Sequence, residues 1–138
     1  MNRMRIVVAV ALVAAAAPIH AHHSFSSDYD SSKPITMDGK ISKIEWKNPH
    51  AFLYIDAKQG NWAIELGSIN SLTRFGWTPT TMKTGDAVKV EGILALEGRH
   101  MILARSVILL RTRQRFRTAE GELPLSGSPS LDTSPAPQ

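Results

Sequence analysis

Alternation of apolar and polar residues with a period of about two is the feature that most limits what this chain can fold into. A pattern of that period places successive side chains on opposite faces of a β-strand. Residues 68–77 interrupt it, because Ile69, Leu72 and Phe75 are spaced as on one face of a helix. We therefore expect the order strand, strand, strand, helix, strand, strand, with strands at residues 35–46, 51–57, 61–67, 86–96 and 101–110.

This order predicts an all-β protein with one short helix, built as a small five-stranded OB-fold-like barrel. The first strand supports the barrel, because its alternation slips once near Ser42 and Lys43. Such a slip indicates a β-bulge, which bends a strand so that it pairs on two sides. Ser68 is suited to cap the helix and Gly76 to end it. An open antiparallel sandwich or roll of the same strands is the alternative.

The two ends of the chain differ in composition from the part between them. Arg3 and Arg5 precede an apolar run over residues 6–17, and small residues lead to Ala21, which is the pattern of a secretory signal peptide. The run is about a dozen residues long, whereas a membrane-spanning helix needs roughly 20, so no span is expected in the mature form. An uncleaved anchor helix is the alternative. We expect a signal peptide at 1–21, an extended arm at 22–34, the barrel at 35–113 and a disordered tail at 114–138.

Net charge argues against a nucleic-acid partner. Two of the 16 lysines and arginines lie in the expected signal peptide, which leaves 14 basic against 12 acidic residues in the mature chain. Export to the periplasm would also separate the protein from nucleic acid. The basic surplus is local, because arginine occupies every second position from Arg111 to Arg117. We interpret this segment as a solvated strand end, with an anion-binding surface as the alternative.

Nitrogen donors gather at the new N-terminus that cleavage after Ala21 would create. His22 would then carry an α-amine beside its own imidazole, and His23 adds a second imidazole. Nitrogen-rich sites favour Cu(II) most among the divalent first-row metals, then zinc or nickel, so Cu(II) or Zn(II) is the expected metal. A specific site also needs a ligand from the barrel. His50 follows a turn, and Glu65 either supplies an oxygen ligand or holds the other ring nitrogen of His50.

Ordinary structural roles also account for these residues. The two N-terminal histidines would then be exposed and idle, and His50 would only brace the turn after Asn48 and Pro49. Glu65 would pair with Arg74 or Lys40 at the mouth of the barrel. The chain has no cysteine, so thiolate metal sites are excluded.

Two other classes of function compete with metal binding. An OB-type barrel with several aromatic side chains suits a binding module for a peptide, a sugar or another periplasmic or envelope protein. An enzyme is the weaker hypothesis, because the sequence shows no serine–histidine–acid spacing, no glycine-rich phosphate loop and no HExxH helix. We therefore name no catalytic residues.

Five motifs in order, HHSF, EWKNPHAF, NWAIELGS, LTRFGWTP and TGDAVKVEG, resemble a widespread family of small exported bacterial proteins with a domain of unknown function. The resemblance covers roughly residues 22–110 and implies export and a small β domain, but no activity. It groups His22, His23, His50 and Glu65. It also adds Arg74 and Trp77 as a wall beside the same site. In the structural alternative, Trp77 covers the bottom of the barrel.

Overall fold

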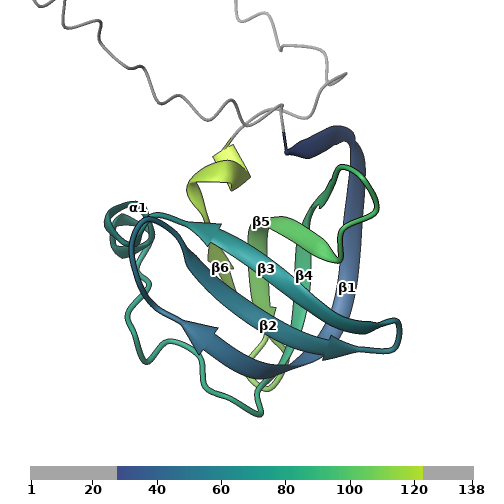
Figure 1. Ribbon diagram of the computed structural model, residues 1–138. Coiled ribbons are helices and arrows are strands. Elements are labelled where there is room, and N and C mark those ends of the chain that lie inside the picture. The colour runs from purple at the N-terminus through teal and green to yellow at the C-terminus, as the bar shows by residue number, and fades with distance from the viewer. Residues whose placement is uncertain (1–27, 123–138) are drawn as a thin grey trace, which may run out of the picture.

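The computed structural model describes residues 28–122, which contain six strands, the helix α1 and a short 3-10 helix, η2 (Figure 1). The expected order of elements is confirmed, with one further strand after the fifth. The elements are β1 (Tyr29–Glu45), β2 (Ala51–Ala57), β3 (Gly60–Gly67), α1 (Ile69–Arg74), β4 (Ala87–Ala95), β5 (Met101–Leu109), β6 (Gln114–Arg117) and η2 (Ala119–Glu122). The expected signal peptide and most of the tail lie outside the described residues. No helix between residues 28 and 122 is long and apolar enough to cross a membrane.

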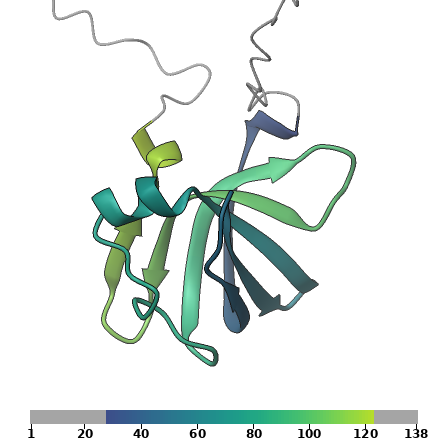
Figure 2. The same cartoon turned by 60° about the vertical axis from the view of Figure 1, so that its left-hand side comes forward.

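Five of the strands form a closed ring, as the OB-like prediction requires. The strands are ordered β3-β2-β1-β4-β5-β6, and a further pairing of β3 with β5 closes the ring (Figures 1 and 2). This closing pair is parallel and joins residues 63–65 to residues 101–103, whereas the other pairs are antiparallel. The fold class is therefore all-β with one short helix, as expected.

The long strand β1 makes the closure possible because it pairs with two neighbours. Its second half pairs with β2, and residues 29–40 pair with β4. The register with β2 shifts between Ile41 and Lys43, so the predicted bulge is confirmed. The strand begins at Tyr29, earlier than the expected start at Ile35, because the Tyr29 ring is buried in a small apolar cluster with Ile93, Ala95 and Leu103.

The helix α1 follows β3 and packs against the main core. Ser68 is its N-cap and accepts a hydrogen bond from the amide of Ser71 at 3.2 Å, as predicted. Leu72 is the buried residue of the helix. Gly76 follows with a φ of +84°, a left-handed conformation that glycine adopts without strain.

Residues 114–122, which we expected in the disordered tail, instead form β6 and η2. Besides the pairing of β6 with β5, contacts from Trp77 and Thr118 attach this segment to the barrel. The Trp77 indole nitrogen donates to the carbonyl of Arg117 at 2.7 Å, and the Trp77 ring packs on Phe116 with centroids 5.4 Å apart. The hydroxyl of the buried Thr118 donates to the carbonyl of Ala104 at 2.6 Å. In the sequence, the residues that make these contacts are surrounded by charged residues and show no periodic pattern.

Candidate functional site

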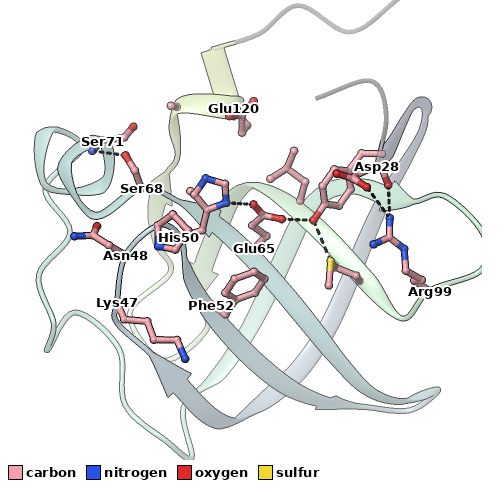
Figure 3. Close-up of a pocket in the computed structure, with 16 residues that line it drawn as sticks. Asp28, Lys47, Asn48, His50, Phe52, Glu65, Ser68, Ser71, Arg99 and Glu120 are labelled. Carbon is pink, nitrogen blue, oxygen red and sulfur yellow. Dashed lines mark hydrogen bonds and ion pairs between the residues drawn. The ribbon is translucent and has the colours of Figure 1, made fainter. Parts of the chain in front are cut away.

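A pocket of about 870 Å³ opens at one end of the barrel (Figure 3). Its walls come from the start of β1, the turn before β2, the facing parts of β2, β3 and β5, the first turn of α1, and η2. The lining combines apolar groups such as Phe52 and Leu103 with the ionisable side chains of His50, Glu65 and Glu120. A concave, mixed surface of this size is typical of a site for a small-molecule ligand.

Glu65 is the centre of the polar side of the pocket. One carboxylate oxygen, Oε1, contacts Nδ1 of His50, and the other, Oε2, accepts a hydrogen bond from the hydroxyl of Tyr29. The Tyr29 hydroxyl also lies 3.1 Å from Sδ of Met101. Only 13% of the Glu65 side chain is exposed, against 47% for His50. The three polar groups therefore form a line from the buried wall to the open side of the pocket.

Strand register explains why His50 and Glu65 meet. Phe52 on β2 is the partner of Glu65 on β3, and His50 stands just before β2. The turn that precedes it contains Asn48 and Pro49, joined by a cis peptide bond. Glu65 itself lies on the face of β3 opposite to the buried Trp62, Ile64 and Leu66, as predicted.

Burial and the carboxylates of the pocket perturb two acidic groups. Burial raises the pKa of the Tyr29 hydroxyl well above its ordinary value, and its hydrogen bond to Glu65 raises the pKa further. Burial also raises the pKa of Glu120, and the nearby Glu65 carboxylate adds to this effect, against smaller lowering by Arg105 and His50. Figure 3 shows Glu120 across the pocket from His50 and Glu65.

At the rim, an arginine fixes the point where the N-terminal segment joins the barrel. The guanidinium of Arg99 donates to the backbone carbonyl of Asp28 at 3.1 Å and lies 3.4 Å from its carboxylate. Arg99 and Glu65 thus hold Asp28 and Tyr29, the first described residues, against the same pocket that contains His50.

The structure brings together two of the residues predicted as metal ligands, His50 and Glu65. The other two, His22 and His23, lie outside the described residues. Arg74 is exposed at the end of α1 and Trp77 is buried in the core, and neither lines the pocket. Trp77 belongs to the main core and contacts Phe116 and Arg117 of β6.

Glu65 pairs with neither Lys40 nor Arg74, the two partners proposed for it in the structural alternative. Its described partners are instead His50 and Tyr29.

Sequence reasoning missed Tyr29, Met101 and Glu120. Tyr29 lay in a polar stretch that we interpreted as an arm, and Glu120 lay in the expected tail. An isolated aromatic residue in a polar arm is a signal that a segment packs on the barrel, but no local signal pointed to Glu120.

The metal hypothesis requires donors beyond those described. Between residues 28 and 122, no group of three histidine or acidic side chains is placed so that it could hold a metal ion. In this pocket the described residues supply one imidazole, that of His50, and a carboxylate that already contacts it. The donor set therefore fits a metal only if further ligands come from elsewhere in the chain.

The fold and this pocket define a small, OB-like β-barrel protein with a histidine–carboxylate–tyrosine line at its mouth. The chain belongs to a family of unknown function, DUF6152, whose model matches residues 9–103. A search of curated proteins found no match. Among solved structures, the chain is similar to the ZRD-deleted mutant of TiaS in complex with agmatine, with 20% identity and a TM-score of 0.45. That match covers 67% of this chain but only 24% of the other chain.

Proposed function

We propose that this protein is an exported metal-binding protein, with a site made by His50 and an N-terminal His22-His23 end, and that copper is its preferred metal. The observation that carries the proposal is the contact between Nδ1 of His50 and the carboxylate of Glu65. Histidines that bind metals commonly donate their other ring nitrogen to a carboxylate, which fixes the ring and makes it a better ligand. Within residues 28–122, nothing is bonded to Nε2 of His50, which leaves that atom for a metal.

The path of the chain supports the involvement of the N-terminal histidines. Asp28, at the start of the described structure, lies on the wall of the pocket. Six residue steps separate it from His22, and an extended chain advances about 3.3–3.6 Å per residue, so His22 lies within about 20 Å of Asp28. His50 belongs to the same pocket. A segment of that length is long enough to bring the N-terminal amine and two imidazoles to His50, as the proposal requires.

Export belongs to the same proposal, because signal cleavage after Ala21 would free the α-amine of His22. Three or four nitrogen donors would then surround the ion, a set that binds Cu(II) more tightly than Zn(II). The role that follows is that of a periplasmic copper carrier, sensor or buffer.

Calorimetric titration of the protein that begins at His22, with Cu(II) and Zn(II), tests the proposal. His50→Ala and acetylation of the His22 α-amine are each expected to weaken Cu(II) binding about tenfold or more, since each removes a nitrogen donor. Glu65→Gln is expected to cost between about 10-fold and 100-fold. His100→Ala is the matched control, because His100 is an exposed histidine that stacks on Trp62 and lies outside the pocket. Unchanged Cu(II) affinity in both the His50 variant and the acetylated protein would reject the site.

The pocket itself favours a second candidate, a binding module for a peptide, a sugar or an envelope protein. Its volume of about 870 Å³ lies within the range of about 300–1,000 Å³ that is usual for ligand pockets, and Phe52 supplies an aromatic wall. Titration of peptides and oligosaccharides into the labelled protein, followed by NMR with and without chelator, separates the two functions. Binding that is lost in Phe52→Ala but unaffected by chelator favours the module, and binding that requires the metal favours metal handling.

A further inference from the structure

A second, smaller pocket lies on the outside of the barrel, where β4, β5 and β6 run side by side. It has a volume of about 190 Å³, and three arginines contribute to its lining, Arg105, Arg115 and Arg117. Two of them belong to the arginine-rich segment that the metal site does not use. The pocket is smaller than the range of about 300 Å³ and more that drug-sized ligands need, so its size suits a small ion or the terminal group of a larger molecule.

Strand register brings these side chains together. Glu91 on β4 is the partner of Ser106 on β5, which in turn is the partner of Arg117 on β6, so the three residues form a row across the sheet. The register between β4 and β5 then shifts, because Gly92 pairs with Ala104 and Arg105 is passed over. A bulge of this kind redirects a side chain, and here it adds the guanidinium of Arg105 to the pocket.

The one carboxylate of the pocket is already neutralised. Both oxygens of Glu91 are bound by the guanidinium of Arg115, one of them at 3.1 Å, and the hydroxyl of Ser106 donates to the same carboxylate at 2.9 Å. Arg115 holds the pKa of Glu91 below its ordinary value, so this carboxylate stays ionised and paired. The charges of the other two arginines are therefore not cancelled within the pocket.

Those two arginines keep donors that the described residues do not satisfy. Arg117 gives one long bond of 3.3 Å to the carbonyl of Gly121. Nε of Arg105 is buried and has no hydrogen-bond partner among residues 28–122. Glu120 is near enough for Arg105 to lower its pKa slightly, but no described hydrogen bond or ion pair joins the two side chains. A buried donor without an acceptor is unfavourable, and an ionised oxygen is the acceptor that binds a guanidinium most strongly.

We propose that the pocket between β4, β5 and β6 binds a phosphate-type oxyanion, which accepts hydrogen bonds from Arg105 and Arg117 beside the closed Glu91–Arg115 pair. The forked donors of arginine match the oxygens of a phosphoryl group. The oxyanion is either free inorganic phosphate or the phosphate of a lipid headgroup, and the two sources present the same chemistry to the pocket. This site shares no residue with the proposed metal site, so failure of one leaves the other standing.

NMR titration of the full chain, labelled with ¹⁵N, tests the proposal with inorganic phosphate at constant ionic strength. The Nε–Hε signal of Arg105 is expected to move saturably at millimolar phosphate, and Arg105→Lys, which lacks Nε, identifies that signal. Arg117→Gln is expected to weaken binding about tenfold, the cost of a charge-assisted hydrogen bond. Arg111→Gln is the matched control, because it removes the same charge from an exposed residue outside the pocket, and its affinity is expected to stay within about twofold.

Vesicles that contain phosphatidic acid, compared with vesicles of phosphatidylcholine alone, distinguish the two sources. If the protein binds the phosphatidic acid vesicles and free phosphate displaces it from them, the ligand is a lipid headgroup. If the protein responds to phosphate but binds neither kind of vesicle, the ligand is the free ion. The proposal is overturned if the Arg105 Nε–Hε signal does not move with phosphate. It is equally overturned if Arg111→Gln weakens binding as much as Arg117→Gln, since surface charge alone would then explain the affinity.

Discussion

The hydrogen bond from Tyr29 to Glu65 joins residues 36 apart in sequence, and we expect it to be one of the stronger single interactions of the barrel. Tyr29 is 7% exposed and the Glu65 side chain 13% exposed, so water cannot readily replace either partner. A hydrogen bond to a charged group contributes about 1.5–3 kcal/mol to the free energy of unfolding. The Glu65→Gln variant should keep part of this free energy, because the glutamine amide can donate a hydrogen bond to the tyrosine oxygen. We therefore expect a coupling energy of about 1–2 kcal/mol between the two residues.

Urea unfolding at neutral pH, with chelator present, measures that coupling through a double-mutant cycle of Tyr29→Phe and Glu65→Gln. The matched control is the exposed ion pair of Asp38 and Lys89, whose charged atoms lie 3.4 Å apart and whose side chains are 62% and 38% exposed. For that pair we expect a coupling below about 0.5 kcal/mol, because solvent screens it. A Tyr29–Glu65 coupling no larger than that of the control would refute the assignment of Glu65 as the group that fixes Tyr29.

Three further predictions concern the folded barrel. The pKa of the Tyr29 hydroxyl is raised in the folded protein, so above a pH of about 10 the unfolded chain loses the hydroxyl proton before the folded chain does. The folded protein should therefore lose stability as the pH rises further, and the Tyr29→Phe variant should lose less. Urea unfolding midpoints measured across alkaline pH test this expectation. Trp77→Phe removes the 2.7 Å bond to the carbonyl of Arg117 and should lower the free energy of unfolding by about 1–2 kcal/mol in urea unfolding. Gly92→Ala would place a Cβ 2.2 Å from the carbonyl oxygen of Leu103, so a loss of about 2 kcal/mol or more is expected, and an unchanged melting temperature would contradict it.

Local features of the sequence predicted most of the barrel. Strand alternation, the slip near Ser42 and Lys43, and the cap at Ser68 each depend on a few consecutive residues, and each is present in the structure. The contact between His50 and Glu65 could also be predicted from the sequence. A residue just before one strand and a residue near the end of the next strand lie close together whenever the two strands form a hairpin.

The parts that sequence reasoning missed depend on contacts between distant segments. β6 is held by Trp77 and Phe116, and η2 follows the buried Thr118, yet none of these residues gives a periodic pattern. The arginines around Phe116 indicated a solvated strand end followed by a disordered tail, with no sign of a sixth strand. Glu120 reaches the pocket only because that segment is anchored, so its role was not visible in its own neighbourhood.

The shared carboxylate of Glu65 connects the two halves of the proposed metal site. One oxygen holds Tyr29, at the point where the N-terminal segment joins the barrel, and the other contacts the ring of His50. In the proposed metal site, this one side chain would orient the ring of His50 and also anchor the strand from which the N-terminal segment departs. If the metal proposal holds, Tyr29→Phe should weaken Cu(II) binding less than Glu65→Gln does, because it loosens the attachment of the segment but leaves the His50 ring in place. Comparing the loss of Cu(II) affinity in the two variants separates two effects of Glu65. One is the orientation of the His50 ring, and the other is the attachment of the segment that carries His22 and His23.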